Sequence, residues 1–281
     1  MTYVLFDIGG TKTRIATSTD LLKFDEVKSY KTPSTFNDGM KKFTETVKEM
    51  TTDVTAIAGG IRGRLMEDKS GIENDGKLTK WAGESVVGYL EKAYGDIPVF
   101  LENDTAIAGV GEATFGAGEG LEIIAYHTVS TGVGGAKIEN GEIDMADVGF
   151  EPGHQILDID RTIMGEDITP TLENMVSGTA VKDRMGVEPY EIPQTDVLWD
   201  DLAGYLAQGL RNTILYWSPD AIVLGGSMII GDPAIKVDAI RKATAEALDG
   251  FEATPLIVEA KLGDEAGLWG GIALLTKRLV D

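Results

Sequence analysis

Cysteine is absent from the 281-residue chain, which excludes disulfides, thiolate zinc sites and cysteine nucleophiles together. Long apolar runs are absent as well, because none reaches the roughly 18 residues that a membrane span requires. Met1 leads almost directly into a β-prone run, so we expect no signal peptide and a cytoplasmic protein. A Walker loop, GxxxxGK followed by Ser or Thr, occurs nowhere in the sequence.

Basic residues are scarce: 25 Lys and Arg stand against 46 Asp and Glu, for a formal net charge of −21. A field of this sign repels nucleic-acid phosphates and acidic membrane surfaces, so we expect neither as a partner. An anionic substrate must then be held by local donors and a metal, against the overall field. Apolar residues make up 43% of the chain, which is enough for a packed core in one large or two moderate domains.

Apolar strand-like runs alternate with amphipathic stretches, and this alternation predicts an α/β fold with a mixed sheet. Strands are expected at 3–8, 13–18, 27–32, 54–58, 97–101, 121–129, 221–224 and 256–260. Helices are expected at 36–50, 84–95, 105–113, 172–185, 197–217, 232–248 and 267–279. The glycine-rich residues 59–64 are interpreted as a loop, and Asp232-Pro233 as an N-cap with proline at the first helical position.

A two-glycine turn, Gly9-Gly10-Thr11-Lys12, joins the first two predicted strands. Glycine lacks a Cβ atom, so a ligand can approach the backbone N–H groups closely, and Thr11 and Lys12 add a hydroxyl and a cation. Asp7 interrupts the apolar run just before the turn, where it can meet a hydrated Mg²⁺. These are the parts of a site that holds a phosphate chain. The alternative is an ordinary hairpin with a surface acid.

A second unit of strand, glycine turn and strand follows at 121–145, with STGVGG at its turn and the hairpin signal Asn140-Gly141 near its end. Together with the first unit at 3–18, it predicts a duplicated architecture of two related halves. Between the two units, Glu102-Asn103-Asp104 places polar side chains where a strand gives way to a helix. Clefts form at such edges of open α/β sheets.

Seven motifs occur in order along the chain: DIGGTKT at 7–13, LEND at 101–104, STGVGG at 130–135, EPGH at 151–154, LENMVSG at 172–178, VLGGS at 223–227 and LGDEAGLWGG at 262–271. With these motifs the chain resembles the ROK family of sugar kinases. The resemblance spans the full length and implies the two-lobed actin- and hexokinase-like (ribonuclease H-like) ATPase fold, α/β with duplicated mixed-sheet domains. It implies a smaller N-terminal lobe of residues 1–105 plus about 268–281 and a larger C-terminal lobe of 106–267.

The resemblance also implies roles for individual positions. Asp104 matches the general base that takes the proton from a sugar hydroxyl as its oxygen attacks the γ-phosphate of ATP, and one carboxylate within hydrogen-bond reach suffices for a loose phosphoryl transfer. A plain helix N-cap is the alternative role for this residue. The positions matching sugar ligands are Gly63, Asn103, Asp104, Glu151, His154 and Glu173. Those matching ATP ligands, on two glycine-rich turns with Mg-ATP between them, are Gly9, Gly10, Thr11, Lys12, Thr131, Gly132, Gly225 and Gly226.

The chain departs from the family pattern on the sugar side. Many ROK proteins carry a cysteine zinc motif in the interval that is 155–171 here, so no zinc is expected and His154 must be oriented by other partners. The family's GxPG loop appears with Arg62 in place of proline, and Lys77 stands where an asparagine is expected. His127, one of two histidines, is interpreted as an ordinary strand residue beside the core.

The resulting hypothesis is an ATP-dependent hexose kinase that converts glucose to glucose 6-phosphate, with Mg²⁺ at Asp7 as its cofactor and a homodimer as its expected assembly. Kinases of N-acetylmannosamine, N-acetylglucosamine or fructose remain open as alternatives, as does a sugar-sensing ROK protein without catalysis. A transcriptional regulator of the family would carry an N-terminal helix-turn-helix, whereas the first phosphate strand is expected here from residue 3.

Overall fold

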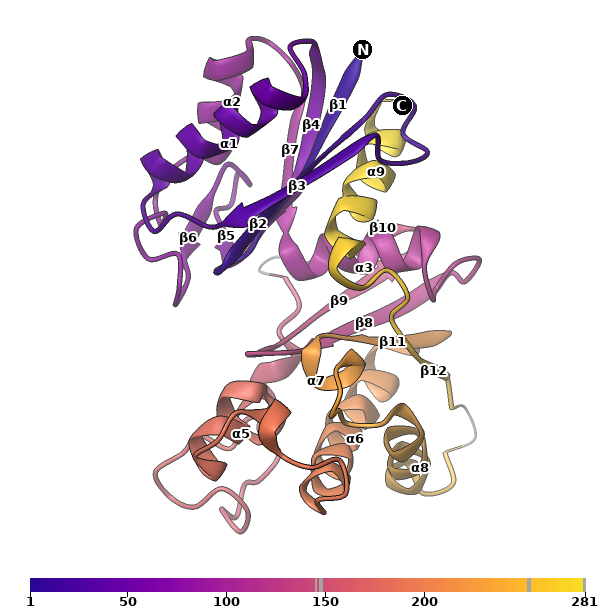
Figure 1. The fold of residues 1–281 in the computed structure, drawn as a ribbon. Coiled ribbons are helices and arrows are strands. Elements are labelled where there is room, and N and C mark those ends of the chain that lie inside the picture. Colours follow the sequence, from indigo (N-terminus) through magenta and orange to yellow (C-terminus); the bar gives the residue numbers. More distant parts are fainter. Residues whose placement is uncertain (145, 147–148, 252–253, 280–281) are drawn as a thin grey trace. The chain divides into compact units, whose positions relative to one another are not determined.

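A computed structural model of the protein describes residues 1–144, 146, 149–251 and 254–279 (Figure 1). The chain divides into two compact units, and each is described by itself. The first unit comprises Met1–Phe115 and the C-terminal segment from Asp264, and the second comprises Gly116–Gly263. In the described part of the chain, no helix is both long enough and apolar enough to cross a bilayer.

The first unit is built on a five-stranded sheet in the order β3-β2-β1-β4-β7. Its strands are β1 (Thr2–Ile8), β2 (Lys12–Ser18), β3 (Glu26–Lys31), β4 (Val54–Ile61) and β7 (Val99–Asn103). The short strands β5 (Arg64–Leu65) and β6 (Ile72–Asn74) form a separate pair. The three strands β1, β2 and β3 are antiparallel neighbours, whereas β4 runs parallel to β1 and β7 parallel to β4.

Helices cover both faces of this sheet. The helices α1 (Phe36–Met50) and α2 (Val86–Tyr94) lie together on one face, and α9 (Ala266–Arg278) lies on the other, beside α3 (Asp104–Phe115) (Figure 1). Side chains alternate along β1, so Val4, Phe6 and Ile8 face α1 while Leu5 packs with α9. Burial on both faces explains why β1 reads as a continuous apolar run.

The second unit repeats the same sheet, in the order β10-β9-β8-β11-β12. The first three strands are again antiparallel neighbours, and the last two are again added in parallel. The strands are β8 (Ile123–Val129), β9 (Val133–Glu139), β10 (Glu142–Ile143), β11 (Ala221–Gly225) and β12 (Leu256–Glu259). The predicted duplication is therefore confirmed at the level of strand order and direction.

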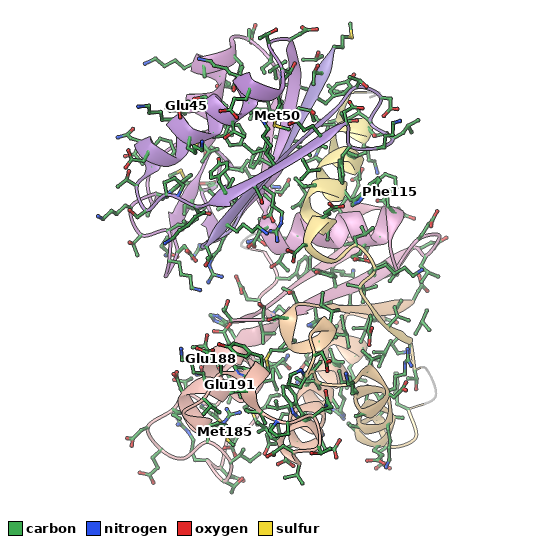
Figure 2. All side chains as sticks on the ribbon, viewed as in Figure 1. Glu45, Met50, Phe115, Met185, Glu188 and Glu191 are labelled. Carbon is green, nitrogen blue, oxygen red and sulfur yellow. The ribbon has the colours of Figure 1, made fainter. Side chains whose placement is uncertain are left out.

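One core cluster of the second unit joins β8 and β11 to α6 (Leu198–Trp217) and α8 (Val237–Leu248). The remaining elements of this unit are η1 (Pro152–His154), α4 (Leu172–Val176), α5 (Gly178–Met185), η2 (Pro189–Glu191) and α7 (Ser227–Ile230). The chain then returns to the first unit through η3 (Gly263–Glu265). Figure 2 shows Met185 at the end of α5, with Glu188 and Glu191 at the η2 turn that follows.

The helix α3 was expected in the C-terminal lobe, but it packs within the first unit. Glycines allow its axis to approach α9 closely, since a Cβ atom at Gly111 would overlap the carbonyl of Ala266 and one at Gly270 would overlap that of Ile107. At the C-terminal end of α3, Phe115 (labelled in Figure 2) contacts Trp269 with ring centroids 5.1 Å apart. The division into compact units consequently follows α3, whereas the expected boundaries lay at 105 and 268.

The prediction of a loop from residue 59 was wrong for its first three residues, which complete β4. A Cβ atom at Gly59 would overlap Phe6 of β1, and one at Gly60 would lie 2.6 Å from Ile107 and 3.0 Å from the Cα atom of Asp104. The glycines therefore mark the close approach of β1 and α3 to this strand rather than the end of it.

The predicted helix 172–185 is two helices that meet at Ser177. The amide of Ser177 donates to the carbonyl of Glu173 at 2.9 Å and ends α4, and its hydroxyl accepts from the amide of Ala180 at 3.2 Å and begins α5. One serine thus serves as C-cap of the first helix and N-cap of the second. Periodicity could not show this break because both helices keep an apolar face toward the same core.

The expected N-cap at Asp232 was also wrong, because α8 begins at Val237 with Lys236 as its N-cap. The preceding segment is not helical and is bound by one distant side chain and one backbone carbonyl. The amide and carbonyl of Ala234 are both paired with the side chain of Gln194, at 2.8 and 2.9 Å. The amide of Ile235 donates to the carbonyl of Met228 at 2.8 Å. These long-range bonds replace the first helical turn that a proline after aspartate favours locally.

Candidate active site

The first glycine turn lies between β1 and β2 and is closed by its own backbone. The amide of Gly9 donates to the carbonyl of Lys12 at 3.0 Å. From β3's end, Thr32 donates its hydroxyl to the Gly9 carbonyl at 2.7 Å and its amide to the Thr11 carbonyl at 2.9 Å. These bonds occupy carbonyls on the sheet side of the turn. Thr11 and Lys12 are exposed, as residues that bind a phosphate must be.

Asp7 is the penultimate residue of β1 and pairs across the hairpin with Arg14 of β2. The Arg14 guanidinium donates to the Asp7 carboxylate at 3.1 Å and also bonds the carboxylate of Asp264. Burial, followed by the charge of Asp104, raises the pKa of Asp7 to about 7, against the lowering effect of Arg14. The surroundings of Asp7 therefore contain too little positive charge to balance its carboxylate, and a divalent cation would supply that charge.

Asp104 is the first residue of α3 and follows directly on β7. Its backbone packs against Gly60 of β4, which anchors the junction between strand and helix. Burial raises the pKa of the Asp104 carboxyl, while a hydrogen bond of 2.7 Å from the Thr105 amide and the charge of Arg62 act to lower it. A carboxylate with a raised pKa is a stronger proton acceptor than a solvated one.

Two expected sugar residues meet on this unit, since the Asn103 side-chain amide donates to the carbonyl of Gly63 at 3.1 Å. The Asn103 side-chain oxygen accepts from the amides of Thr105 and Ala106, at 3.0 and 3.2 Å. Asn103 is therefore the residue that caps α3. The cap and the loop containing Gly63 are bonded into one structure beside Asp104.

The second glycine turn lies between β8 and β9 and is held mainly by elements that follow it. The Ser130 amide donates to the Gly132 carbonyl at 2.8 Å, and the Thr179 hydroxyl donates to the Thr131 carbonyl at 2.6 Å. Glu173 of α4 accepts from the amide of Val133 at 2.8 Å. Glu173 was expected to bind sugar, and here its carboxylate supports the turn.

Glu151 directly precedes the short helix η1 and His154 is its last residue, and both are exposed. Close contacts hold η1 against β9, because a Cβ atom at Gly153 would overlap the carbonyl of Val133 and one at Gly135 would lie 2.5 Å from Pro152. Both expected sugar residues therefore sit on one rigid turn at the edge of the second sheet.

Gly225 ends β11 and Gly226 begins the turn into α7. Gly226 has a φ of 88°, and a Cβ atom there would overlap the backbone of Val129, so glycine is required at this position. This approach brings the Ser227 hydroxyl within 3.1 Å of the Ser130 hydroxyl on the second glycine turn. The two segments expected to bind ATP in the second unit are thus neighbours.

The structure groups the expected residues by unit: Asp7, the first glycine turn, Gly63, Asn103 and Asp104 belong to the first, and the others belong to the second. His127 is confirmed as a core residue, fully buried with its Nε2 atom 3.1 Å from the Thr213 hydroxyl. Sequence reasoning missed Arg14. The register of a tight hairpin places it opposite Asp7, so this signal was available.

Comparison with known proteins identifies the family, because the family model described as "ROK family" matches residues 3–278. The chain belongs to the ROK family. A fructokinase from Lactococcus lactis subsp. cremoris is 28% identical to this ROK chain over 268 residues, which cover 92% of the chain and 89% of that protein. A glucokinase from Thermotoga maritima is 22% identical over 274 residues, covering 86% of each.

Solved structures agree with this membership. The ROK hexokinase from Thermus thermophilus aligns with a TM-score of 0.83 at 28% identity, covering 99% of this chain and all of that one (100%). The actin- and hexokinase-like fold expected from the motifs is therefore confirmed. Curated relatives that match most of this ROK chain include fructokinases and glucokinases.

The segment 155–171 of this ROK chain is organised around an aspartate. Asp158 is 4% exposed and accepts from the amides of Thr162, Ile163 and Met164, at 2.9, 2.9 and 2.8 Å. Burial acts to raise the pKa of Asp158, but these amides outweigh it and hold the pKa below its ordinary value. The residue gave no signal in the sequence, because its partners depend on how the loop turns.

Proposed function

We propose that this chain transfers the γ-phosphoryl group of ATP to a hydroxyl of a hexose. The observation that carries the proposal is the position of Asp104. It is a desolvated carboxylate at the junction of β7 and α3, packed on the same strand, β4, that pairs with the phosphate-turn strand β1. Family membership and the sugar-kinase relatives support it.

In the proposed reaction Asp104 is the general base. The sugar hydroxyl oxygen forms a bond to the γ-phosphorus as the bond from that phosphorus to the β–γ bridging oxygen breaks, and ADP leaves. The hydroxyl proton passes to the Asp104 carboxylate. Its raised pKa suits this step because the carboxylate must hold the proton long enough for ADP to depart.

Asp7 fits the role of an acidic group that holds Mg²⁺ through water. Among the described residues no group of three or more acidic or histidine side chains is arranged to hold a metal, so a cation here would be held by one carboxylate and the phosphates. When bound, Mg²⁺ neutralises phosphate charge. Arg14 keeps the Asp7 carboxylate oriented by its bond across the hairpin.

The nucleotide would be bound by Gly9, Gly10, Thr11 and Lys12 of the first unit. Thr131, Gly132, Gly225 and Gly226 would supply the contacts of the second. For the sugar, Asn103 and Gly63 would bind beside Asp104, and Glu151, His154 and Glu173 would supply hydroxyl partners. Fructose and glucose are the acceptors to test first, because the relatives include fructokinases and a glucokinase.

The test is the substitution Asp104→Asn, compared with wild type on a panel of hexoses and N-acetylhexosamines with Mg-ATP. We expect hexose-dependent ADP release from wild type, and a loss of about 10²–10⁴-fold in kcat for the variant with nucleotide binding retained. Near-wild-type turnover in the variant would remove Asp104 from the base role. No hexose-dependent ADP release from wild type would leave a sugar-binding protein without catalysis.

A further inference from the structure

Two cations absent from the family's usual pattern lie against the first glycine turn. A Cβ atom built on Gly10 would lie 2.9 Å from the Cδ atom of Lys77 and 3.2 Å from the Cδ atom of Arg62. The aliphatic stems of both side chains therefore pack on the backbone of the turn. All three residues belong to the first unit, so their arrangement is set within one compact body.

The Arg62 side chain is held in place by Asp75. Its Nε atom donates to the Asp75 carboxylate at 2.9 Å, and the other carboxylate oxygen accepts from the amides of Lys77 and Leu78 at 2.8 and 2.7 Å. The Asp75 side chain is only 6% exposed, and Leu78 is buried in the core of the unit. One aspartate thus fixes Arg62 and the backbone of Lys77 together.

Donors remain on both cations for a ligand. Within the described part of the chain, Asp75 is the side chain that bonds Arg62, and it engages only Nε of a guanidinium with five N–H donors. Lys77 is exposed, and its ammonium has no acidic partner among the residues that the structure describes. In a chain of net charge −21, two such cations beside a phosphate turn concentrate positive potential where an anion would bind.

We propose that Arg62 and Lys77 form a cationic clamp that binds the terminal phosphate of the donor at the first glycine turn. The inference rests on the proposed kinase reaction and deepens it. Arg62 packs on this turn, and its charge acts on the Asp104 carboxyl. It can therefore stabilise the charge on the phosphoryl oxygens as the sugar oxygen attacks and ADP leaves. Lys77, on the exposed side, adds affinity for the bound nucleotide.

The experiment compares the affinities of a non-hydrolysable ATP analogue and of ADP, each with Mg²⁺, by calorimetry. Arg62→Gln and Lys77→Met each should lower the ratio of analogue to ADP affinity by about tenfold, because only the analogue carries the terminal phosphate. Arg64→Gln is the matched control. Arg64 lies two positions after Arg62 and is paired with Glu73 at 3.2 Å, so its substitution should leave the ratio unchanged. Arg62→Lys should restore part of the loss. Retained ADP affinity shows that each variant is folded.

Turnover gives a second readout. Arg62→Gln should lose about 10²-fold in kcat, as expected for one preorganised donor, while Lys77→Met should mainly raise KM for ATP. An unchanged affinity ratio in both variants would overturn the clamp, as would a wild type that binds analogue and ADP equally. Another outcome is that the wild type turns over only sugars that carry a carboxylate or phosphate, with this turnover lost in Arg62→Gln. That result would show that Arg62 binds the acceptor and would overturn the clamp. If the wild type has no hexose kinase activity, the proposed function is wrong. The ratio of analogue affinity to ADP affinity still tests the clamp in that case.

Discussion

Four aspartates of this protein fall into two groups according to their hydrogen-bond donors. Asp75 and Asp158 accept from two and three backbone amides, and these amides lower the pKa of each against the raising effect of burial. Asp7 accepts a hydrogen bond from a guanidinium, and Asp104 accepts one from a single backbone amide. Burial raises the pKa of both carboxyls. The first pair holds loops. The second pair is electrostatically costly in the free protein, which is the usual signature of groups kept for chemistry.

At the same scale, His127 predicts how stability depends on pH. Burial lowers its pKa from 6.5 to about 4, and its Nδ1 atom has no partner among the described residues. Below pH 6.5 the His127 imidazole binds a proton in the unfolded state but stays neutral in the folded state. Stability is therefore lost as pH falls from 6.5 toward 4. Each pH unit in this window costs about 1.4 kcal/mol.

The substitution His127→Gln keeps a side-chain partner for Thr213 without a titrating group. We expect the fall in free energy of unfolding between about pH 7 and about pH 5 to be shallower in this variant, measured by urea melts at each pH. His154→Gln is the matched control, because His154 is exposed and should leave the slope as it is. Equal slopes in wild type and His127→Gln would contradict the assignment.

At the scale of elements, segments without regular structure are held by single side chains that satisfy more than one backbone group. Asp158 accepts from three amides in the segment 155–171, and Gln194 binds the amide and the carbonyl of Ala234 in the segment that leads into α8. Both residues supply the hydrogen bonds that a strand partner or a helical turn would otherwise provide. The segment before α4 therefore needs no cysteine ligands to keep a defined backbone.

The corresponding prediction concerns Asp158→Asn. Asparagine has the same shape but replaces one acceptor oxygen with a donor, which sets N–H against N–H. We expect a lower Tm and faster hydrogen exchange of the Ile163 and Met164 amides, with exchange near β1 unchanged. Asp160→Asn, at an exposed position two residues away, should change neither quantity. Unaltered exchange at Ile163 and Met164 would show that Asp158 does not hold this segment.

At the scale of the whole molecule, the excess of acidic residues dominates. The charge of −21 lies mostly on residues 116–263, the second unit, and acts against the compact state through self-repulsion. Exposed ion pairs such as Lys28 with Glu49 offset little of it. The same field disfavours any polyanion, so binding of an anion would depend on local cations such as those proposed at the first glycine turn.

Salt should therefore stabilise this protein. Raising NaCl from about 20 mM to about 500 mM shortens the Debye length several-fold and should raise Tm, with little effect of changing Na⁺ to K⁺. Differential scanning fluorimetry at fixed pH measures this directly. A neutral osmolyte at matched osmolality serves as the control for non-ionic effects. A Tm that falls as salt rises would mean that ion pairs, rather than repulsion, dominate the surface.

The sequence by itself determined what depends on local pattern. The β1–β2 turn, the repeat of a strand, glycine turn and strand in two halves, the place of His127 beside the core and the position of Asp104 at a strand–helix junction were all readable, because periodicity and turn chemistry act over a few residues. The tertiary structure alone decided where distant segments satisfy one another. It extended β4 through Gly59-Gly60, moved the start of α8 past Pro233 and paired Arg62 with Asp75. Each of these outcomes depends on close packing or hydrogen bonds between residues far apart in the chain, and no local propensity encodes such a partner.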